Sequence, residues 1–379
     1  MKEQICKICV MDETDLDIEF DTKGVCSHCK DAERKIHNYQ FSTNEDRTNL
    51  KDLAIEIKKR QKGEYDSILG LSGGVDSSYV AHLAMEMGLN PLCVHFDNGW
   101  NSDIAVKNIK NIIDVTGFDL YTYVIDWSEF RDLQRAFFKA GVVDIEMLTD
   151  HAIFASLFKI RKDHGITTVL SGTNYTTEHG MPKAWTWGKM DLRNIKAIQK
   201  RFGSMKIKSF PTMNTFYWLM MRQFNLGGIF EEPLNRINFR KTDAMQLLTE
   251  KFSWQYYGGK HYESVFTKFY QAYILPTKFG IDKRKVHLSC LIRNSELSRK
   301  DALVELEGIL YEEIDLKRDK KFVLKKLGFS ETEFRQIMVD KPIPHDFYPT
   351  DRTYILPLIK FGKLVYGYTA PNLRQSVNK

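Results

Sequence analysis

A glycine-rich loop between an expected strand and an expected helix constrains this chain more than any other stretch. Residues 69–78 read LGLSGGVDSS. The apolar run 68–71 is short enough to be a buried strand, and residues 78–87 carry apolar side chains at helical spacing. A glycine loop at that place is an anion site, because the backbone passes close to phosphate oxygens while the free N–H groups and the positive end of the helix dipole face them.

The loop also contains a carboxylate, which sets it apart from a Walker A loop. No Gly-Lys-Ser/Thr follows the glycines at the required spacing, so no lysine is placed at the β- and γ-phosphates. Instead, Asp76 stands where a phosphate site would otherwise exclude a negative charge. A carboxylate at this position makes sense if it holds a Mg²⁺ ion that neutralises the departing phosphates.

The motif resembles the pyrophosphate loop (PP-loop) of the N-type ATP pyrophosphatases through Ser72, Gly73, Gly74, Val75, Asp76 and Ser77. This group includes the synthetase parts of GMP, NAD and asparagine synthetases, the argininosuccinate synthetases and the tRNA thiolases. The resemblance implies that the loop binds ATP with Mg²⁺ and that Asp76 is catalytic. An incidental glycine turn before a helix is the alternative, which a lone Gly-Gly pair would favour and the whole motif disfavours.

Four of the six cysteines form two closely spaced pairs near the start of the chain. Cys6 and Cys9 make one Cys-x-x-Cys pair, and Cys26 and Cys29 make the other. This is the spacing of a structural zinc site, in which four thiolates meet tetrahedrally. Disulfides are the alternative, which a reducing compartment disfavours. Four protein ligands leave no open position, so we expect the Zn²⁺ to support folding rather than catalysis.

Length and charge limit the class of protein without selecting its substrate. With 379 residues, the chain is long enough for two or three folding units. A net charge of +6 suits a nucleotide or sugar-nucleotide substrate and also suits RNA. No window of about 18 apolar residues exists and the first residues are polar and charged, so we expect a cytoplasmic protein. Cys93 and Cys290 are expected to be small core residues.

We divide the chain into three units. Residues 1–40 form a zinc-binding knuckle unit, which is too small to hold together without the metal. Residues 41–250 form the PP-loop ATP pyrophosphatase domain, whose first helix starts at a capping box over residues 42–45. Residues 251–379 form a mainly helical C-terminal region that completes the substrate site, with a hairpin expected near residues 361–363.

Buried strands alternate with helical stretches in the middle unit. The expected strands are 66–71, 91–96, 120–125 and 167–170. This alternation predicts an α/β fold, with a parallel sheet and helices on both faces, as in adenine nucleotide alpha hydrolase-like (PP-loop) proteins. In such sheets, ligands bind beyond the carboxyl ends of the strands.

Polar residues follow two of the other strand ends. Asp97 stands at the end of the second strand, and Gly172 and Asn174 belong to the turn after the fourth. Family resemblance assigns Asp97 to the adenine and ribose, and the Gly-Thr-Asn turn to the other side of the nucleotide. Ordinary turn chemistry is the alternative for both sites.

Two segments carry groups suited to a charged sugar. The loop after the fourth strand contains Glu178, Trp187 and Lys189, and aromatic rings beside cations suit a sugar or a uracil with charged neighbours. A solvated loop with core tryptophans is the alternative. The block 257–264, YGGKHYES, adds Lys260 and His261 as candidates for substrate binding.

A basic turn lies further along the C-terminal region. An aromatic helix face over residues 262–273 is expected to end before Pro276, and Lys283 and Arg284 follow on a turn. Similar Lys-Arg pairs occur late in the synthetase domains of the superfamily, which implies a catalytic role in neutralising phosphate charge. A solvated charged turn is the alternative.

Taken together, the cysteine pairs, the 172–174 turn with its tryptophans, and the 257–264 and 278–284 blocks resemble the N-acetyl sugar amidotransferases of bacterial surface-polysaccharide and nonulosonic acid pathways (the WbpG/PseA type). The resemblance spans nearly the whole chain. It implies that an N-acetyl group of an activated sugar becomes an acetamidino group. The amide oxygen attacks ATP to give an O-adenylyl imidate, and ammonia displaces AMP.

The family's ammonia comes from a separate glutaminase that resembles the one in histidine biosynthesis, together with a cyclase-like companion. This sequence offers no cysteine at residue 2 and no nucleophile elbow around its two remaining cysteines, so we expect an external ammonia source. The main rival function is tRNA thiolation, which also couples this loop to zinc knuckles. We expect no catalytic cysteine pair and no appended RNA-binding module. A zinc-knuckle protein with a degenerate nucleotide fold is a third alternative.

Overall fold

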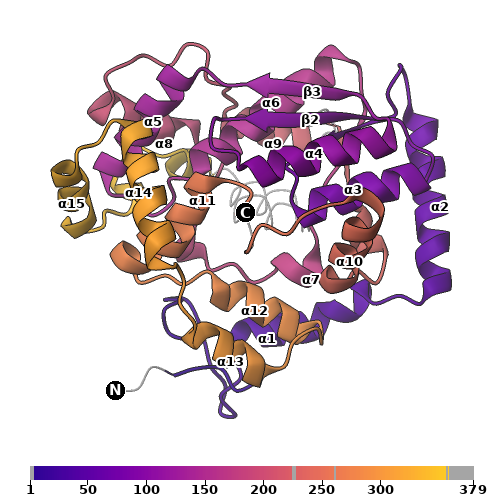
Figure 1. Ribbon diagram of the computed structural model, residues 1–379, viewed down its shortest axis with the longest axis horizontal. Helices are drawn as coiled ribbons and strands as arrows, with labels where there is room; N and C mark the ends of the chain where they lie inside the picture. The colour runs from indigo at the N-terminus through magenta and orange to yellow at the C-terminus, as the bar shows by residue number, and fades with distance from the viewer. Residues whose placement is uncertain (1–3, 224–227, 260–261, 356, 358–379) are drawn as a thin grey trace.

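A computed structural model of the chain describes residues 4–223, 228–259, 262–355 and 357. Within these residues the centre is a five-stranded, entirely parallel sheet (Figure 1). Its order is β3-β2-β1-β4-β5, and the strands are β1 Ser67–Gly70, β2 Pro91–Asp97, β3 Leu120–Val124, β4 Thr168–Leu170 and β5 Ile229–Glu231. The first four match the predicted strands to within one residue at each end. Sequence reasoning missed β5, because three residues are too few to show a period.

Helices connect the strands. In the middle of the chain they are α2 Thr43–Arg60, α3 Val75–Glu86, α4 Asp103–Thr116, α5 Trp127–Ala140, α6 Met147–Asp163, α7 Tyr175–Glu178, α8 Leu192–Phe202, α9 Thr215–Gln223 and α10 Lys241–Phe252, with 3₁₀ turns η2 Lys183–Trp185 and η3 Pro233–Arg236. α2 starts at the predicted capping box, where the Ser42 hydroxyl and the Glu45 carboxylate each accept from the other residue's backbone N–H.

Both faces of the sheet are covered, as predicted, because neighbouring residues of a strand point to opposite sides. On β1, Ile68 packs in a cluster with Leu157 and Ile160 of α6. The next residue, Leu69, packs in a different cluster with α2, α3 and α10. Figure 1 shows α3 and α4 in front of the sheet and α6 behind it. The α/β fold class is therefore confirmed.

The chain ends in a helical region, as predicted. Its elements are α11 Val265–Phe269, the π-helix η4 Tyr270–Phe279, α12 Arg284–Arg293, α13 Arg299–Glu307, α14 Glu313–Leu327, α15 Glu331–Val339 and the 3₁₀ turn η5 His345–Phe347. The predicted boundary between the PP-loop domain and the C-terminal region, at residue 250, falls within α10. The domain boundaries stay predictions. The expected hairpin at 361–363 lies outside the described residues. None of the helices within the described residues is both long and apolar enough to cross a membrane.

The prediction of a helix end before Pro276 was wrong. α11 continues into η4, which contains Pro276 and ends at Gly280, a glycine in the left-handed region with φ +67°. Proline interrupts an α-helix because its ring meets the preceding turn and its nitrogen has no hydrogen to donate. A π-helix hydrogen-bonds across a wider turn, so the proline ring is accommodated where an α-helix would break.

The N-terminal segment, with α1 Ser27–Lys35 and η1 Ile36–Tyr39, packs against the C-terminal helices. α1, α12 and α13 lie together at the lower edge of Figure 1. Val10 shares an apolar cluster with Leu288 and Ala302, and its backbone N–H donates to the Ser289 hydroxyl at 3.2 Å. The knuckle unit thus shares its core with a segment nearly three hundred residues away, an arrangement that no local pattern encodes.

Candidate nucleotide site and four-cysteine centre

The glycine loop joins β1 to α3 and forms the N-terminus of that helix. Gly74 is the N-cap residue and Val75 the first helical residue, three residues earlier than the predicted start at Ser78. Gly73 has φ +80°, and a Cβ there would lie 2.5 Å from the Ala105 carbonyl oxygen of α4. Only glycine fits, because the conformation is left-handed and the neighbour is backbone. The loop N–H groups at this helix start are suited to an anion.

Hydrogen bonds fix the shape of the loop. The Ser72 hydroxyl accepts from the Gly74 N–H at 3.2 Å and lies 3.1 Å from the Ser77 hydroxyl. On the other side, the Gly73 carbonyl accepts from the Trp254 indole N–H at 2.9 Å and from the Asn108 amide at 3.3 Å. Both donors are buried, so these hydrogen bonds hold the loop backbone in place.

A cavity of about 220 Å³ opens beside the loop. Its described lining comes from three parts of the chain: Ser72, Gly74, Val75, Asp76 and Ser77 from the loop; Ser171, Gly172, Thr173, Thr177 and Glu178 from the turn after β4 and from α7; and Lys241, Tyr256, Tyr257, Gly259 and Glu263. The cavity therefore lies beyond the carboxyl ends of β1 and β4, where ligands bind in parallel α/β sheets. Seven of the predicted site residues meet there.

Gly172 allows this meeting. A Cβ at Gly172 would lie 3.2 Å from the backbone nitrogen of Ser77 and 3.2 Å from the carbonyl carbon of Asp76. The turn after β4 therefore passes directly over the first turn of α3, so closely that a larger residue at position 172 would be in tight contact with that backbone. Asn174 is not among the described lining residues. It is buried, caps α7 by accepting from the Thr177 N–H at 2.8 Å, and donates to the Gly172 carbonyl at 3.4 Å.

The lining includes residues that sequence reasoning missed. Glu263 reaches the cavity because its segment pairs with the β2–α4 loop: Ser102 N–H donates to the Glu263 carbonyl, and Val265 N–H to the Trp100 carbonyl, both at 2.8 Å. A Cβ on Gly74 would lie 3.2 Å from the Tyr257 hydroxyl and 3.6 Å from a Glu263 carboxylate oxygen. Tyr257 and Glu263 belong to the 257–264 block, so the block was the available signal, although Lys260 and His261 were chosen from it.

The electrostatics of the cavity favour a bound cation. Among the described lining residues, Asp76, Glu178 and Glu263 supply three carboxylates and Lys241 supplies one ammonium group. Burial, together with the charges of Glu263 and Asp76, holds the pKa of Tyr257 above its ordinary value. An anionic nucleotide would be repelled by this set unless a cation neutralised it, and carboxylate oxygens are the ligands that Mg²⁺ prefers. The donor set therefore fits Mg²⁺.

Some predicted residues lie elsewhere. Asp97 ends β2 and accepts from the Gly99 N–H at 2.8 Å and the Asn101 amide at 3.2 Å, and it is not among the described lining residues. Trp187 is a buried core residue: its ring stacks on His345 at 4.9 Å between centroids, and the Arg352 guanidinium lies 3.7 Å from its ring centre.

Lys189 and the basic turn are engaged in ion pairs. Lys189 bridges Asp144 at 2.7 Å and Asp150 at 3.0 Å, and these pairs counter the effect of burial and raise the pKa of the lysine.

Arg284 pairs with Asp282 at 2.8 Å and donates to three backbone carbonyls at the end of α13. Lys283 lies 3.9 Å from Glu146. Neither cation belongs to the described lining of the cavity, so their phosphate role stays a prediction. Lys260 and His261 lie outside the described residues.

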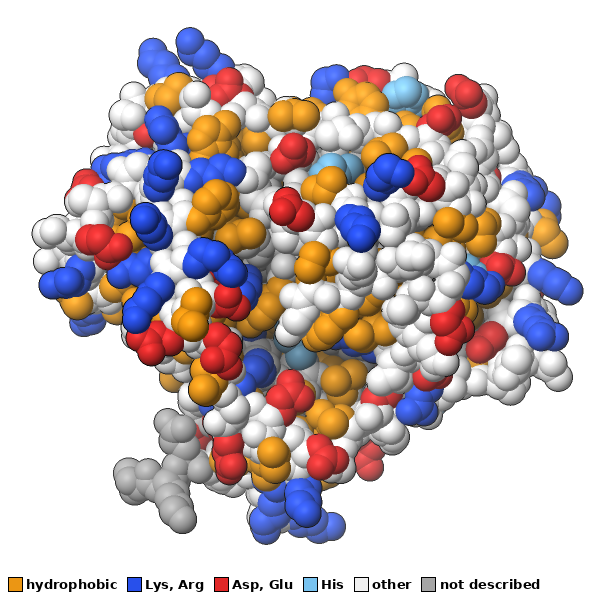
Figure 2. Space-filling view, in the orientation of Figure 1, with side chains coloured by type: hydrophobic (Ala, Val, Ile, Leu, Met, Phe, Trp, Pro, Cys, Tyr) orange, Lys and Arg blue, Asp and Glu red, His pale blue; other side chains and the backbone are white. Residues whose placement is uncertain are grey.

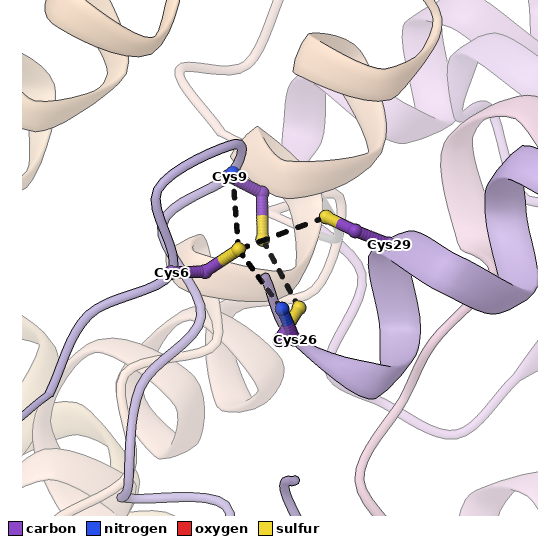
Figure 3. A group of neighbouring side chains, drawn as sticks. All are labelled: Cys6, Cys9, Cys26 and Cys29. Atoms are coloured by element: carbon purple, nitrogen blue, oxygen red, sulfur yellow. Dashed lines mark hydrogen bonds between the residues drawn. The ribbon is translucent and has the colours of Figure 1, made fainter. Parts of the chain in front are cut away.

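The four predicted zinc ligands converge (Figure 3). Their sulfur atoms all lie within 4.8 Å of one another, with Cys6 and Cys29 at 3.9 Å and Cys9 and Cys26 at 3.6 Å. A tetrahedral Zn²⁺ with bonds of about 2.3 Å would hold its sulfurs roughly 3.8 Å apart. All four are buried and none is in a disulfide. The donor set and spacing fit Zn²⁺.

Comparisons with known proteins agree with this description. Residues 263–364 match the family described as LPS biosynthesis protein WbpG-like, C-terminal domain. The chain is 33% identical over 86 residues to the tRNA(Ile)-lysidine synthase of Chlamydia pneumoniae (22% of this chain and 25% of the relative). It is 40% identical over 65 residues to the glutamine-hydrolysing GMP synthase of Baumannia cicadellinicola subsp. Homalodisca coagulata (17% and 12%).

Another relative is the putative glutamine-hydrolysing GMP synthase 2 of Bacteroides thetaiotaomicron, 43% identical over 61 residues (16% of this chain and 14% of the relative). The chain thus spans at most a quarter of the length of these curated relatives. Among solved structures, NMN synthetase from Francisella tularensis matches with a TM-score of 0.31 and 19% identity, over 36% of this chain and 56% of that one.

GMP synthases are among the enzymes whose pyrophosphate loop the 72–77 motif resembles. Part of this chain is therefore similar in sequence to PP-loop synthases, and residues 263–364 are similar to the WbpG-like C-terminal domain.

Proposed function

We propose that this chain is the ATP-dependent synthetase subunit of an amidotransferase that converts the N-acetyl group of an activated bacterial surface sugar to an acetamidino group. One observation carries the proposal. The segment that matches the WbpG-like family begins at Glu263, and Glu263 lines the same cavity as Asp76 and the glycine loop. The family-specific segment therefore contributes directly to the candidate ATP site.

The proposed reaction has two steps. The amide oxygen of the N-acetyl group attacks the α-phosphorus of ATP, the bond from that phosphorus to the bridging oxygen breaks, and pyrophosphate leaves. The amide nitrogen gives up its proton, and the product is an O-adenylyl imidate. Ammonia then adds to the imidate carbon and AMP departs, which leaves the acetamidino group. Most of the protein's contribution is to position the reactants and to neutralise charge.

The chain's own residues divide this work. We propose that the loop N–H groups at the start of α3, with the hydroxyls of Ser72 and Ser77, bind the β- and γ-phosphates that leave. Asp76 and Glu263 would hold Mg²⁺, which supplies charge neutralisation to the triphosphate when it is bound. The Lys241 side chain also lines the cavity and adds a positive charge there. Lys283 and Arg284 remain candidates for contacts with the leaving group.

We propose an external supply of ammonia from a separate glutaminase of the histidine-biosynthesis type, with its cyclase-like companion. Cys93 and Cys290 are both buried, and burial raises the pKa of the Cys93 thiol to about 12. The Cys290 thiol donates to the His179 carbonyl at 3.0 Å. A glutaminase nucleophile must be accessible and ionised, so neither thiol suits that role.

The test is to incubate the purified chain with Mg²⁺, ATP and ammonium chloride against a panel of UDP-diacetamido sugars and nonulosonic acids. AMP, pyrophosphate and a product lighter by one mass unit, from replacement of oxygen by NH, are the expected results. The same mixture with glutamine in place of ammonium should be inactive. ADP and orthophosphate as products would refute the proposal, and glutamine-driven turnover by the chain alone would refute the external ammonia source.

A tRNA-modifying activity is the second candidate. It is favoured by the similarity to a tRNA(Ile)-lysidine synthase and by the basic surface of α14, over which Lys and Arg side chains gather in Figure 2. RNA binding of this kind releases counterions, so affinity would fall steeply with salt. Tight tRNA binding at 50 mM salt that is lost at 200 mM, with AMP formed only when tRNA is present, would establish this alternative.

A further inference from the structure

One side chain joins the four-cysteine centre to the candidate nucleotide site. Arg293, on α12, donates through Nε to the Cys29 sulfur and through one terminal nitrogen to the Cys9 sulfur, both at 3.4 Å. Its other terminal nitrogen lies 3.0 Å from Nε2 of His179. The guanidinium group is planar and offers several donors in a fixed fork, so it spans two sulfurs and an imidazole at once.

His179 connects Arg293 to α7 through its two ring nitrogens. A guanidinium can only donate, so the Nε2 atom of His179 accepts from Arg293 and its Nδ1–H donates to the Tyr175 carbonyl at 2.7 Å. Tyr175 is the first residue of α7, and His179 directly follows the last. Two of the four α7 residues, Thr177 and Glu178, line the cavity beside the glycine loop.

α7 depends on such anchors because a single helical turn is not stable by itself. At its start, the Tyr175 N–H donates to the Asn235 side chain at 2.7 Å. Along its side, Tyr175 stacks between Tyr39 and His179, with 4.5 Å between ring centroids in each pair. At its end, the anchors are the Arg293 contact and the Cys290 thiol on the His179 carbonyl.

We propose that Arg293 is a positioning residue of the nucleotide site, which ties α7 to the four-cysteine centre so that an assembled centre fixes Thr177 and Glu178 in the cavity. The inference deepens the proposed function, because it rests on nucleotide binding in that cavity. Metal-bound cysteines are thiolates and accept hydrogen bonds better than thiols, so a bound metal strengthens the hold on Arg293. The centre then contributes to the geometry of the site as well as to folding.

Arg299 provides a matched control. It lies on α13 and anchors the same cysteine loop, donating to the Cys6 carbonyl at 2.9 Å and the Cys9 carbonyl at 3.0 Å. The Arg299 guanidinium donates to the cysteine backbone, whereas the Arg293 guanidinium donates to cysteine sulfur and also contacts His179 at the end of α7. Arg293→Met and Arg299→Met thus remove equal charge from the same neighbourhood, and the two variants differ in the contacts to the cysteine sulfurs and in the link to α7.

The experiment compares wild type, Arg293→Met, Arg299→Met, His179→Ala and the double variant that combines Arg293→Met with His179→Ala. Zinc content is measured by mass spectrometry, and affinity for Mg²⁺ with an ATP analogue carrying a methylene bridge between the α- and β-phosphorus is measured by calorimetry. We expect Arg293→Met and His179→Ala to bind the analogue about tenfold more weakly, the double variant to be no weaker than either, and Arg299→Met to change affinity less than twofold. His179→Ala leaves the sulfurs untouched and must retain full zinc.

A second readout does not depend on nucleotide. Hydrogen exchange of the α7 amides should be faster in Arg293→Met than in Arg299→Met, with zinc content equal to wild type in the variants compared. Equal affinities and equal α7 exchange in the two arginine variants would overturn the inference. If Arg293→Met loses zinc, His179→Ala decides: wild-type affinity and exchange there would overturn it. Wild-type protein that does not bind the analogue at all would instead refute the proposed function.

Discussion

Replacing Gly73 by alanine tests how the glycine loop is built. The added Cβ would sit 2.5 Å from the Ala105 carbonyl oxygen, and the residue would have to keep φ +80°. The left-handed conformation costs an alanine about 1–2 kcal/mol. To escape the contact, the peptide must move away from the two side chains that donate to the Gly73 carbonyl, and each weakened hydrogen bond costs roughly 1 kcal/mol.

These losses are partly offset by the smaller conformational freedom of alanine in the unfolded chain, worth about 0.4–1 kcal/mol. We therefore expect Gly73→Ala to lower the free energy of unfolding by roughly 2–3 kcal/mol. Urea unfolding followed by tryptophan fluorescence measures the change. At a slope of about 2–3 kcal/mol per molar, the midpoint should fall by roughly 1 M urea.

Gly74→Ala is the matched comparison. Gly74 has φ −74°, which alanine adopts freely, and its Cβ would lie 3.2 Å from the ends of two side chains, Ser72 and Tyr257. Those groups line the cavity and can shift, so the stability loss should stay below about 1 kcal/mol while nucleotide affinity falls. The reasoning is refuted if Gly74→Ala destabilises the protein more than Gly73→Ala, or if Gly73→Ala unfolds at the wild-type urea concentration.

Three further predictions concern the metal centre, the protonation of buried histidines and the cations. Cys29→Ser, or removal of zinc by a chelator, should lower the thermal midpoint by more than about 5 °C, with zinc released in proportion. The reason is that a loss of several kcal/mol shifts the midpoint by about 1–2 °C per kcal/mol in a chain of this size. An unchanged midpoint in zinc-free protein would contradict a folding role. Burial lowers the pKa of His151 to about 4 and of His345 to about 3, so both histidines are neutral in the folded protein at pH 7. The free energy of unfolding should therefore fall as the pH drops from about 6.5 towards 4, by up to roughly 2 kcal/mol per histidine at pH 5. Urea titrations at pH 7 and pH 5 measure this change, and greater stability at pH 5 would contradict the prediction. Lys241→Met should raise the KM for ATP severalfold with little loss of stability. Arg284→Met, which removes contacts to Asp282 and the end of α13, should lower the unfolding midpoint. A change in the KM for ATP in Arg284→Met without loss of stability would support its predicted phosphate role.

Local patterns predicted the elements of this protein because each was encoded within a few residues. The 72–77 loop, the strands before it and after it, and the Ser42 capping box are signals of backbone conformation and burial, which neighbouring residues decide. The four-cysteine centre could also be predicted from the sequence, because each Cys-x-x-Cys pair supplies two of the four ligands of a tetrahedral site. The helix through Pro276 was misread because its π-type turns depend on packing around it.

Tertiary structure alone decided which of the chemically suitable residues meet. Glu263 and Tyr257 reach the glycine loop from nearly two hundred residues away. The Glu263 segment does so by pairing with the β2–α4 loop, and this pairing carries no periodic signal. Trp187 and Lys189 were predicted to contact the substrate. In the structure, the Trp187 ring stacks on His345 and the Lys189 ammonium group pairs with Asp144.

The sequence by itself thus determined the α/β fold, the glycine loop between β1 and α3 and the four-cysteine centre, because each follows from short-range geometry. The lining of the cavity and the Arg293 link to α7 arise from long-range packing, where side chains distant in sequence are brought within hydrogen-bond distance.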